Sequence, residues 1–407
     1  METPGRLKLF CNPRARRPSA DAPDTSWASP EALRTVRRFH QTLPGYQPTP
    51  LVALNQLARR LGLGGIWIKD ESRRFGLKAF KALGASYAVC AVLAEQLGLA
   101  PPLNFAAFRQ PEIRRRLSNI TLLAASDGNH GLAVAWMAAQ LGCRSRILLP
   151  RDTAACRTRA IELMEGEAIR VDGNYDAAVD RAAREADQPG ALLIQDTGRQ
   201  GYETVPLWVM QGYLTLFEEA FDQMSGFLPS HVFVPCGVGS LAGSLQAYLV
   251  ERYGGQRPRL IVIEAAAADC YYRSMAAGGA SIIAVEGNLE TRMAGLACGV
   301  PSHLGWPLLR RFADGFASCP DAIATDGMRH LAFPLPEDPP VESGECGAVT
   351  LGCLQHLLQV ERGKGEQVPL ELGPAARILL ISTEGATNPD SYRGMLGEGV
   401  DRSLLGD

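Results

Sequence analysis

Short apolar runs alternate with helical patterns along most of the chain from about residue 60 onward. The apolar runs that are typical of buried strands cover residues 65–70, 121–126, 146–150, 168–173, 192–196, 231–236, 259–265 and 377–383. Between them, residues 131–142 and 158–167 are two of the stretches with the pattern of a helix. Strands that alternate with helices of about 10–15 residues indicate βαβ units and parallel sheets with both faces covered. The pattern therefore predicts an α/β fold.

Three segments interrupt this alternation. Residues 11–30 are rich in Pro, Arg, Ala and Ser, which predicts an irregular arm over the surface. Residues 333–345 and 361–375 are rich in Pro, Gly and charged residues, and we interpret them as loops rather than as domain boundaries. With 407 residues the chain is long for a single core, so we predict two packed domains.

Composition argues against several classes of protein. The formal net charge is −2, with acidic and basic residues mixed along the chain, so neither a nucleic-acid groove nor a polybasic membrane patch is indicated. The ten cysteines are scattered singly, without a CxxC pair or the spacing of metal ligands, so we predict no metal site. Dispersed thiols, the lack of a signal-peptide core and the lack of an apolar run of about 18 residues predict a cytoplasmic protein with no membrane partner.

The turn after one apolar run has the sequence PCGVGSLAGS (residues 235–244). In open α/β sheets, ligands bind where strands lead into helices. Gly237 and Gly239 leave backbone N–H groups bare ahead of a helix start, an arrangement that holds an anion such as a phosphate. The turn lacks the full GxGxxG spacing, because Ala242 stands three residues after Gly239. A plain tight turn is therefore an equal alternative.

A second turn, ASDGNHGLAVAW (residues 125–136), crowds polar groups between a strand and a helix. Such crowding is costly unless the groups meet a ligand. Capping of the helix by Asp127 or Asn129 would explain one of these residues but not the whole run. His130, taken alone, fits a structural hydrogen bond better than a catalytic base.

Further turns carry the remaining candidates. Asp196 ends an apolar run, where a carboxylate is a base, a cation binder or part of a turn-forming Asp-Thr-Gly. Hydroxyls and a carboxylate close the last run in LLISTEGAT (residues 379–387), and Lys78 and Lys81 lie three apart in FGLKAFKALGAS (residues 75–86). A lysine, an anion-binding turn, a polar loop and terminal hydroxyls together meet the needs of pyridoxal phosphate.

At this point the chain resembles the fold-type II (tryptophan synthase β-like) family of pyridoxal-phosphate enzymes, and within it the diaminopropionate ammonia-lyases, over about residues 43–395. The motifs that carry the resemblance are PGYQPTPL (44–51), KDESRRFGLKAFKALG (69–84), DGNHG (127–131), QDTGRQGY (195–202), MQGY (210–213), MAGLACGVPSHLGW (293–306), GECGAV (344–349) and STEGAT (382–387). The block 293–306 discriminates best, because general serine or threonine dehydratases do not carry it. The chain departs from the family at Lys78, near Arg199, at Ala265 and at Cys346, where asparagine, tryptophan, proline and serine are more usual.

The resemblance implies a fold and a cofactor. Two domains would each hold a mostly parallel twisted sheet flanked by helices: residues 1–85 with 200–407 form the large domain and residues 86–199 the small one. Pyridoxal 5'-phosphate would lie in the cleft between them. Lys81 would be the Schiff-base residue and Lys78 a surface or rim charge, although a partly buried Lys78 would depress the pKa of Lys81. The other implied cofactor contacts are Phe80, Asn129 at the 3-oxygen, Gly237, Val238, Gly239, Ser240 and Leu241 at the phosphate, and Ser382 or Thr383 at the ring nitrogen.

The resemblance also implies a reaction. A lyase of this family, in a fold class that commonly forms homodimers, eliminates the β-amino group of 2,3-diaminopropionate and yields pyruvate and two molecules of ammonia. Because the β-ammonium is cationic, a carboxylate at Asp127 suits this small amino-acid substrate. Asp127 would serve the D-isomer and Asp196 the L-isomer from opposite faces, with Ser126 and His130 also contacting the substrate. A serine/threonine dehydratase or β-replacing synthase on the same fold, and a catalytically silent cofactor-binding protein, are the alternatives.

Overall fold

A computed structural model describes residues 6–17, 22–364 and 370–397, in which the strands form two sheets. The larger sheet has the spatial order β1-β10-β9-β8-β11-β3-β2. The bounds of its strands are β1 Lys8–Cys11, β2 Leu51–Ala53, β3 Gly65–Asp70, β8 His231–Pro235, β9 Arg259–Ala265, β10 Gly315–Cys319 and β11 Arg377–Ser382. The inner strands run parallel, whereas β1 and β2 pair antiparallel at the two edges.

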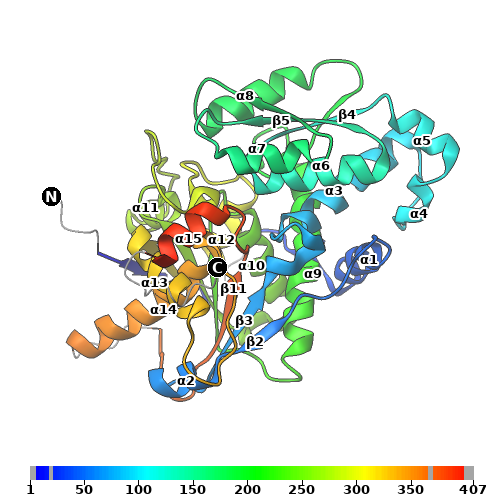
Figure 1. The fold of residues 1–407 in the computed structure, drawn as a ribbon. Coiled ribbons are helices and arrows are strands. Elements are labelled where there is room, and N and C mark those ends of the chain that lie inside the picture. The colour runs from blue at the N-terminus through cyan, green and yellow to red at the C-terminus, as the bar shows by residue number, and fades with distance from the viewer. Residues whose placement is uncertain (1–5, 18–21, 365–369, 398–407) are drawn as a thin grey trace.

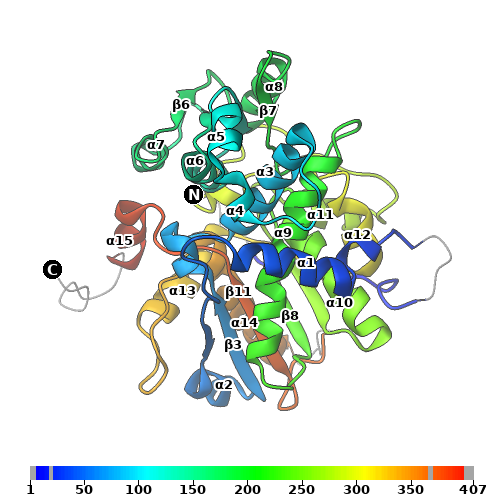
Figure 2. The ribbon, with the colours of Figure 1, turned by 90° about the vertical axis from the view of Figure 1, so that its right-hand side faces the viewer.

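The smaller sheet has the order β6-β5-β4-β7, and all of its strands are parallel. Its strands are β4 Thr121–Ala125, β5 Arg144–Leu149, β6 Glu167–Arg170 and β7 Ala191–Leu193. Figures 1 and 2 show β4 to β7 and their helices as a lobe above the larger sheet. The predicted α/β architecture with two mostly parallel sheets is therefore confirmed, and the smaller sheet falls within the range predicted for the small domain. The boundaries at residues 85/86 and 199/200 stay a prediction.

Helices cover both sheets. Their bounds are α1 Pro30–Gln41, α2 Asn55–Leu61, α3 Lys81–Leu97, α4 Phe105–Phe108, α5 Pro111–Leu117, α6 Asn129–Leu141, α7 Ala155–Glu162, α8 Tyr175–Glu185, α9 Thr204–Gln223, α10 Ser240–Tyr253, α11 Cys270–Ala276, α12 Gly305–Phe312, α13 Asp321–Ala332, α14 Glu345–Lys364 and α15 Pro389–Gly397. Among the helices that the structure describes, none is long and apolar enough to cross a membrane.

The inner strands are apolar along their whole length because both faces of the larger sheet are covered. In β8, Val232 and Val234 belong to the core on one face, and Phe233 belongs to the core on the other. The side chains of a strand alternate between the two faces of its sheet. A strand that is buried on both faces therefore has no polar alternation, which is why the continuous runs at β8 and β9 predicted strands correctly.

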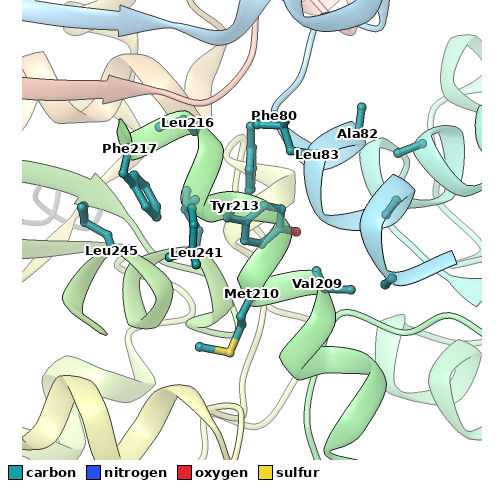
Figure 3. Packing of buried hydrophobic residues seen from close by; sticks show 14 of the residues in the cluster. Phe80, Ala82, Leu83, Val209, Met210, Tyr213, Leu216, Phe217, Leu241 and Leu245 are labelled. Carbon is teal, nitrogen blue, oxygen red and sulfur yellow. The ribbon is translucent and has the colours of Figure 1, made fainter. Parts of the chain in front are cut away.

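The first turn of α3 is held against α9 by a close crossing of the two helices. A Cβ atom added to Gly212 would lie 2.6 Å from Cα of Gly84 and 2.5 Å from the carbonyl oxygen of Leu83, so the crossing requires glycine there. The rings of Phe80 and Tyr213 pack beside this crossing with centroids 4.8 Å apart, as Figure 3 shows. The end of α3 that begins with Lys81 is thereby fixed in position.

The strand predictions agree with the structure, with two corrections at strand ends and three omissions. The strand predicted over residues 168–173 ends at Arg170, and that over residues 192–196 ends at Leu193. Asp196 therefore lies in the turn beyond β7 rather than at its last residue. The strands β1, β2 and β10 were not predicted. The first two are short antiparallel edge strands, and β10 has the sequence GFASC, whose small residues give a weak apolar signal.

The helix and loop predictions need more correction. The helix predicted over residues 158–167 ends at Glu162, because Glu165 adopts φ +59° and β6 begins at Glu167. Residues 333–344 are irregular as predicted, but α14 continues to Lys364 into the predicted loop 361–375, of which residues 365–369 lie outside the described ranges.

The predicted arm over residues 11–30 is irregular between β1 and a short 3-10 helix at Ser26–Ala28, with residues 18–21 outside the described ranges. It does not merely lie over the surface. The side-chain amide of Asn12 donates to the carbonyl oxygen of Ala313 at 2.9 Å, and the residue is buried. The guanidinium of Arg311 in turn donates to the carbonyl oxygen of Arg14.

Candidate active site

The turns that follow the strands of both sheets converge on one cavity. Its walls come from the start of α3, the turn before α6, the turn beyond β7, the β8–α10 turn, the segment 294–298 and the end of β11. The predicted site residues in its lining are Phe80, Lys81, Asp127, Asn129, Asp196, Gly237, Val238, Gly239, Ser240, Leu241 and Thr383. Three others, Ser126, His130 and Ser382, are buried but do not line it.

Lys81 begins α3, and its amine meets the carboxylate of Asp196. Nζ donates to Oδ2 of Asp196 at 2.5 Å, and the side chain of Lys81 is 20% exposed. Burial alone lowers the pKa of this amine, but the negative charge of Asp196 outweighs burial and raises the pKa above its ordinary value. The backbone holds the residue in place, because the N–H of Phe80 donates to the carbonyl oxygen of Thr383 at 3.1 Å.

Lys78 is an exposed surface charge, one of the two placements predicted for it. Its amine lies 3.0 Å from Oε1 of Glu342, and both side chains are nearly half exposed. The condition under which Lys78 would depress the pKa of Lys81, partial burial, is not met, because the side chain of Lys78 is exposed.

Asp196 is the more enclosed of the two candidate carboxylates. Burial alone raises its pKa, but the Lys81 ammonium and the His130 imidazole outweigh burial and hold the pKa at about 2. The backbone carbonyl of Asp196 accepts a hydrogen bond from Oγ of Ser240 at 2.6 Å. This bond ties the turn beyond β7 to the first residue of α10.

Asp127 lies at the rim of the cavity beside Arg157. Its side chain is 27% exposed, and Oδ2 lies 3.5 Å from the nearer guanidinium nitrogen of Arg157, which also donates to the Asp127 carbonyl oxygen at 2.9 Å. The alternative in which Asp127 or Asn129 caps α6 is wrong. The N-cap residue is Gly128, without a side-chain cap bond, and Oγ of Ser126 accepts from the N–H groups of Gly128 and Gly131, each at 2.9 Å.

Asn129 is held by a residue to which the sequence assigned no role. Its side-chain amide donates to Oε2 of Glu384, a buried carboxylate that lines the cavity. Glu384 lies in the motif STEGAT, and the carboxylate at the end of the last strand was the sequence feature that could have predicted its place in the site. An amide with one N–H engaged in this way presents its second N–H in a fixed direction.

The glycines of the β8–α10 turn are required by packing as well as by access to a ligand. A Cβ atom on Gly237 would lie 2.8 Å from the carbonyl oxygen of Gly295. Gly239 has φ +98°, and a side chain there would overlap the hydroxyl of Tyr271. A valine at Gly239 would therefore disturb the fold of the turn itself. Gly239→Val would lower cofactor affinity whether the turn binds a phosphate directly or only shapes the site.

The arrangement fits pyridoxal phosphate. Backbone N–H groups at the start of the fourteen-residue helix α10 face the cavity, where the helix dipole favours a phosphate. Oγ1 of Thr383 is buried in the lining and lacks a hydrogen-bond partner within the part of the chain that the structure describes, so this hydroxyl is available to a bound group. The hydroxyl of Ser382 is not, because it donates to Oγ of Ser343 at 2.8 Å.

Other lining residues were not predicted as site residues. Tyr175 at the start of α8 reaches the cavity, and its hydroxyl accepts from the side-chain amide of Gln195 at 2.8 Å. Residues 294–298 form a wall, and their motif was the most discriminating block of the resemblance, yet it suggested no role. Cys346, one of the departures, also lines the cavity. Within the described residues no group of three His, Cys, Asp or Glu side chains is placed to hold a metal ion.

Comparisons with known proteins agree with this site. A family model described as a pyridoxal-phosphate dependent enzyme matches residues 42–366. The chain is 43% identical over 369 residues to the diaminopropionate ammonia-lyase of Salmonella typhimurium, covering 89% of this chain and 91% of that relative. It is similar to two crystal structures of diaminopropionate ammonia lyase from Escherichia coli, one in complex with D-serine and one with an aminoacrylate-PLP azomethine reaction intermediate. Each has a TM-score of 0.86, 39% identity and 97% coverage of both chains.

These matches cover most of the chain. The chain therefore belongs to the pyridoxal-phosphate-dependent enzymes and, within them, to the diaminopropionate ammonia-lyase family.

Proposed function

We propose that the protein catalyses the elimination of ammonia from 2,3-diaminopropionate, with pyruvate and two molecules of ammonia as products. The observation that carries this proposal is the presence of two carboxylates, Asp127 and Asp196, in one cavity with the amine of Lys81. A substrate with a cationic β-ammonium suits such a site better than serine or threonine, whose β-hydroxyl is neutral.

The cofactor would be held by three parts of the chain. Lys81 would attach it covalently, backbone N–H groups of residues 237–241 would hold its phosphate, and Oγ1 of Thr383 would meet its ring nitrogen. The free Oγ1 of Thr383 supports this residue over Ser382. When bound, the cofactor withdraws electrons from the Cα atom of an amino acid attached to it, which makes the Cα–H bond acidic.

The two carboxylates would then supply the bases. Asp196 is adjacent to Lys81 and would remove the Cα proton of the L-isomer, whereas Asp127 would remove that of the D-isomer from the opposite side. Each proton would be returned to the departing ammonia, which leaves as ammonium. Asn129, which is fixed by Glu384, would orient the cofactor through its 3-oxygen.

Release of pyruvate and ammonia from diaminopropionate, measured beside serine and threonine, tests this function. We expect turnover of both isomers of diaminopropionate to exceed that of serine and threonine. Faster turnover of a hydroxyl amino acid would instead favour a dehydratase, and a protein that binds the cofactor but turns over none of these would be a silent member of the family. A homodimer, a cytoplasmic location and the boundaries of the two domains stay predictions from the sequence.

A further inference from the structure

His130 lies behind Asp196, outside the lining of the cavity. It is the second residue of α6, and its side chain is 2% exposed. Its Nε2 lies 2.7 Å from the carbonyl oxygen of Ile194, and because a carbonyl oxygen only accepts, Nε2 must carry a hydrogen. The other ring nitrogen, Nδ1, therefore has no hydrogen when the imidazole is neutral.

This Nδ1 atom is buried and lacks a hydrogen-bond partner among the residues that the structure describes. It lies 3.9 Å from Oδ2 of Asp196, the same oxygen that accepts from Lys81. Two electron-rich atoms that face each other in a buried site are unfavourable unless a proton lies between them. The separation of 3.9 Å is longer than a hydrogen bond, so a proton passes between Nδ1 and Oδ2 only when the two side chains approach each other by about 1 Å.

The position of His130 beside Asp196 points to a role for the imidazole, and the inference rests on the function proposed above. We propose that His130 is a positioning residue for Asp196, and that its Nδ1 takes over the proton which Asp196 has removed from the Cα atom of the substrate. The proton moves from Cα to Oδ2 of Asp196 and then to Nδ1, which forms an imidazolium whose Nε2–H still donates to Ile194. Nδ1 then gives the proton back to Asp196, which passes it to the departing ammonia, and the ammonia leaves as ammonium.

The charges around the imidazole support this role. The charged groups that act on it are Lys81 at the start of α3, Asp127 in the turn before α6 and Asp196 beyond β7. Burial lowers the pKa of His130, Lys81 lowers it further, and the two carboxylates raise it. While the ammonium of Lys81 is bonded to Asp196, the imidazole stays neutral and ready to accept. When the Lys81 ammonium is lost, the negative charge of Asp196 is no longer balanced, and it favours the protonated form of His130.

Asp127 has a different neighbour. The group beside its carboxylate is the guanidinium of Arg157, which holds its protons at every accessible pH and cannot accept another. Because His130 adjoins Asp196 and the guanidinium of Arg157 adjoins Asp127, we expect His130 to matter for a single isomer of the substrate.

The kinetic test uses the holoenzyme of the His130→Gln variant. The glutamine amide can still donate to the Ile194 carbonyl oxygen but cannot take up a proton, so a purely structural role would be rescued. We expect kcat to fall roughly tenfold, with KM little changed, for whichever isomer the Asp196→Asn variant fails to turn over, and to change less than about twofold for the other. Equal loss on both isomers, or full activity on both, would overturn the proposal.

A second test does not depend on turnover. The titration of His130 is followed by NMR in the cofactor-free protein, in Lys81→Met and in Lys81→Met with Asp196→Asn. We expect the pKa of His130 to rise by roughly one unit when Lys81 is replaced and to fall back when Asp196 is replaced as well. If the pKa of His130 is unchanged by both substitutions, the proposal is overturned even where the wild-type enzyme is active. If the wild-type enzyme turned over neither isomer, the proposed function would fail and this titration alone would decide the role of His130.

Discussion

Asp127 and Asp196 are the same residue type in one cavity, but their surroundings differ. Asp196 is 6% exposed and bonds the amine of Lys81, whereas Asp127 is 27% exposed and lies beside the guanidinium of Arg157. An amine gives up its proton in the course of a reaction, while a guanidinium stays charged. The charge that faces Asp196 therefore changes with the state of the site, and the charge that faces Asp127 does not. Two carboxylates in one cavity can act as two distinct bases for this reason.

The largest effect should come from removing the amine on the Asp196 side. In Lys81→Ala the covalent attachment of the cofactor is lost, so turnover of both isomers should fall below detection. Borohydride reduction of the wild-type holoenzyme, followed by peptide mapping, should place the cofactor on Lys81. Lys78→Ala is the matched control, because an exposed ion pair contributes only about 0–1 kcal/mol. A label on Lys78 would contradict the assignment.

A smaller effect should follow from changing the partner of Asp127. In Arg157→Gln the carboxylate loses its fixed positive neighbour, and we expect about a tenfold lower kcat/KM, equivalent to about 1.4 kcal/mol, for the isomer that Asp127 serves. The other isomer should be nearly unaffected. Arg159→Gln alters an exposed arginine on the same helix and provides the control. Equal loss on both isomers would mean that Arg157 supports the fold of the site rather than one base.

A further effect, on stability rather than on rate, should appear when the cofactor-free protein is unfolded at acid pH. The pKa of Asp196 is about 2, below its value of about 3.9 in an unfolded chain. A carboxylate with a lowered pKa stabilises the folded state above its unfolded pKa and loses that contribution as the pH falls through its folded value. The free energy of unfolding by urea should therefore favour wild type over Asp196→Asn by an amount that shrinks between about pH 5 and pH 2, on the order of 2 kcal/mol in total. A difference independent of pH would contradict the ion pair.

The sequence predicted most of the inner strands, because short continuous apolar runs such as those of β8 and β9 are typical of strands that are buried on both faces. It did not predict β10, whose small residues pack only because β1 and β9 flank it. It also could not decide which residue caps α6. Ser, Asp and Asn all cap helices, and only the three-dimensional structure shows that the N-cap residue is Gly128 and that Ser126 binds the N–H groups of Gly128 and Gly131.

The site was predictable where its chemistry lies in a single turn and not where it depends on packing. Lys81 entered the site through the family resemblance of its motif, and the glycine turn was one of two equal interpretations of a local pattern. Arg157 and Tyr175 come from α7 and α8, and nothing local to their sequences signals that the fold brings them beside Asp127 or into the lining of the cavity. The partner of Asn129 likewise stands 255 residues further along the chain.

The most direct test of this account is the turnover of D- and L-diaminopropionate by Asp127→Asn and Asp196→Asn, measured as pyruvate release with cofactor content matched. Removal of a general base lowers a rate by about 10²–10⁴-fold. The account predicts that Asp127→Asn loses the D-isomer and keeps most activity on the L-isomer, and that Asp196→Asn does the reverse. Equal loss of both isomers in each variant would contradict it, because the two carboxylates would then share one binding role instead of acting as separate bases.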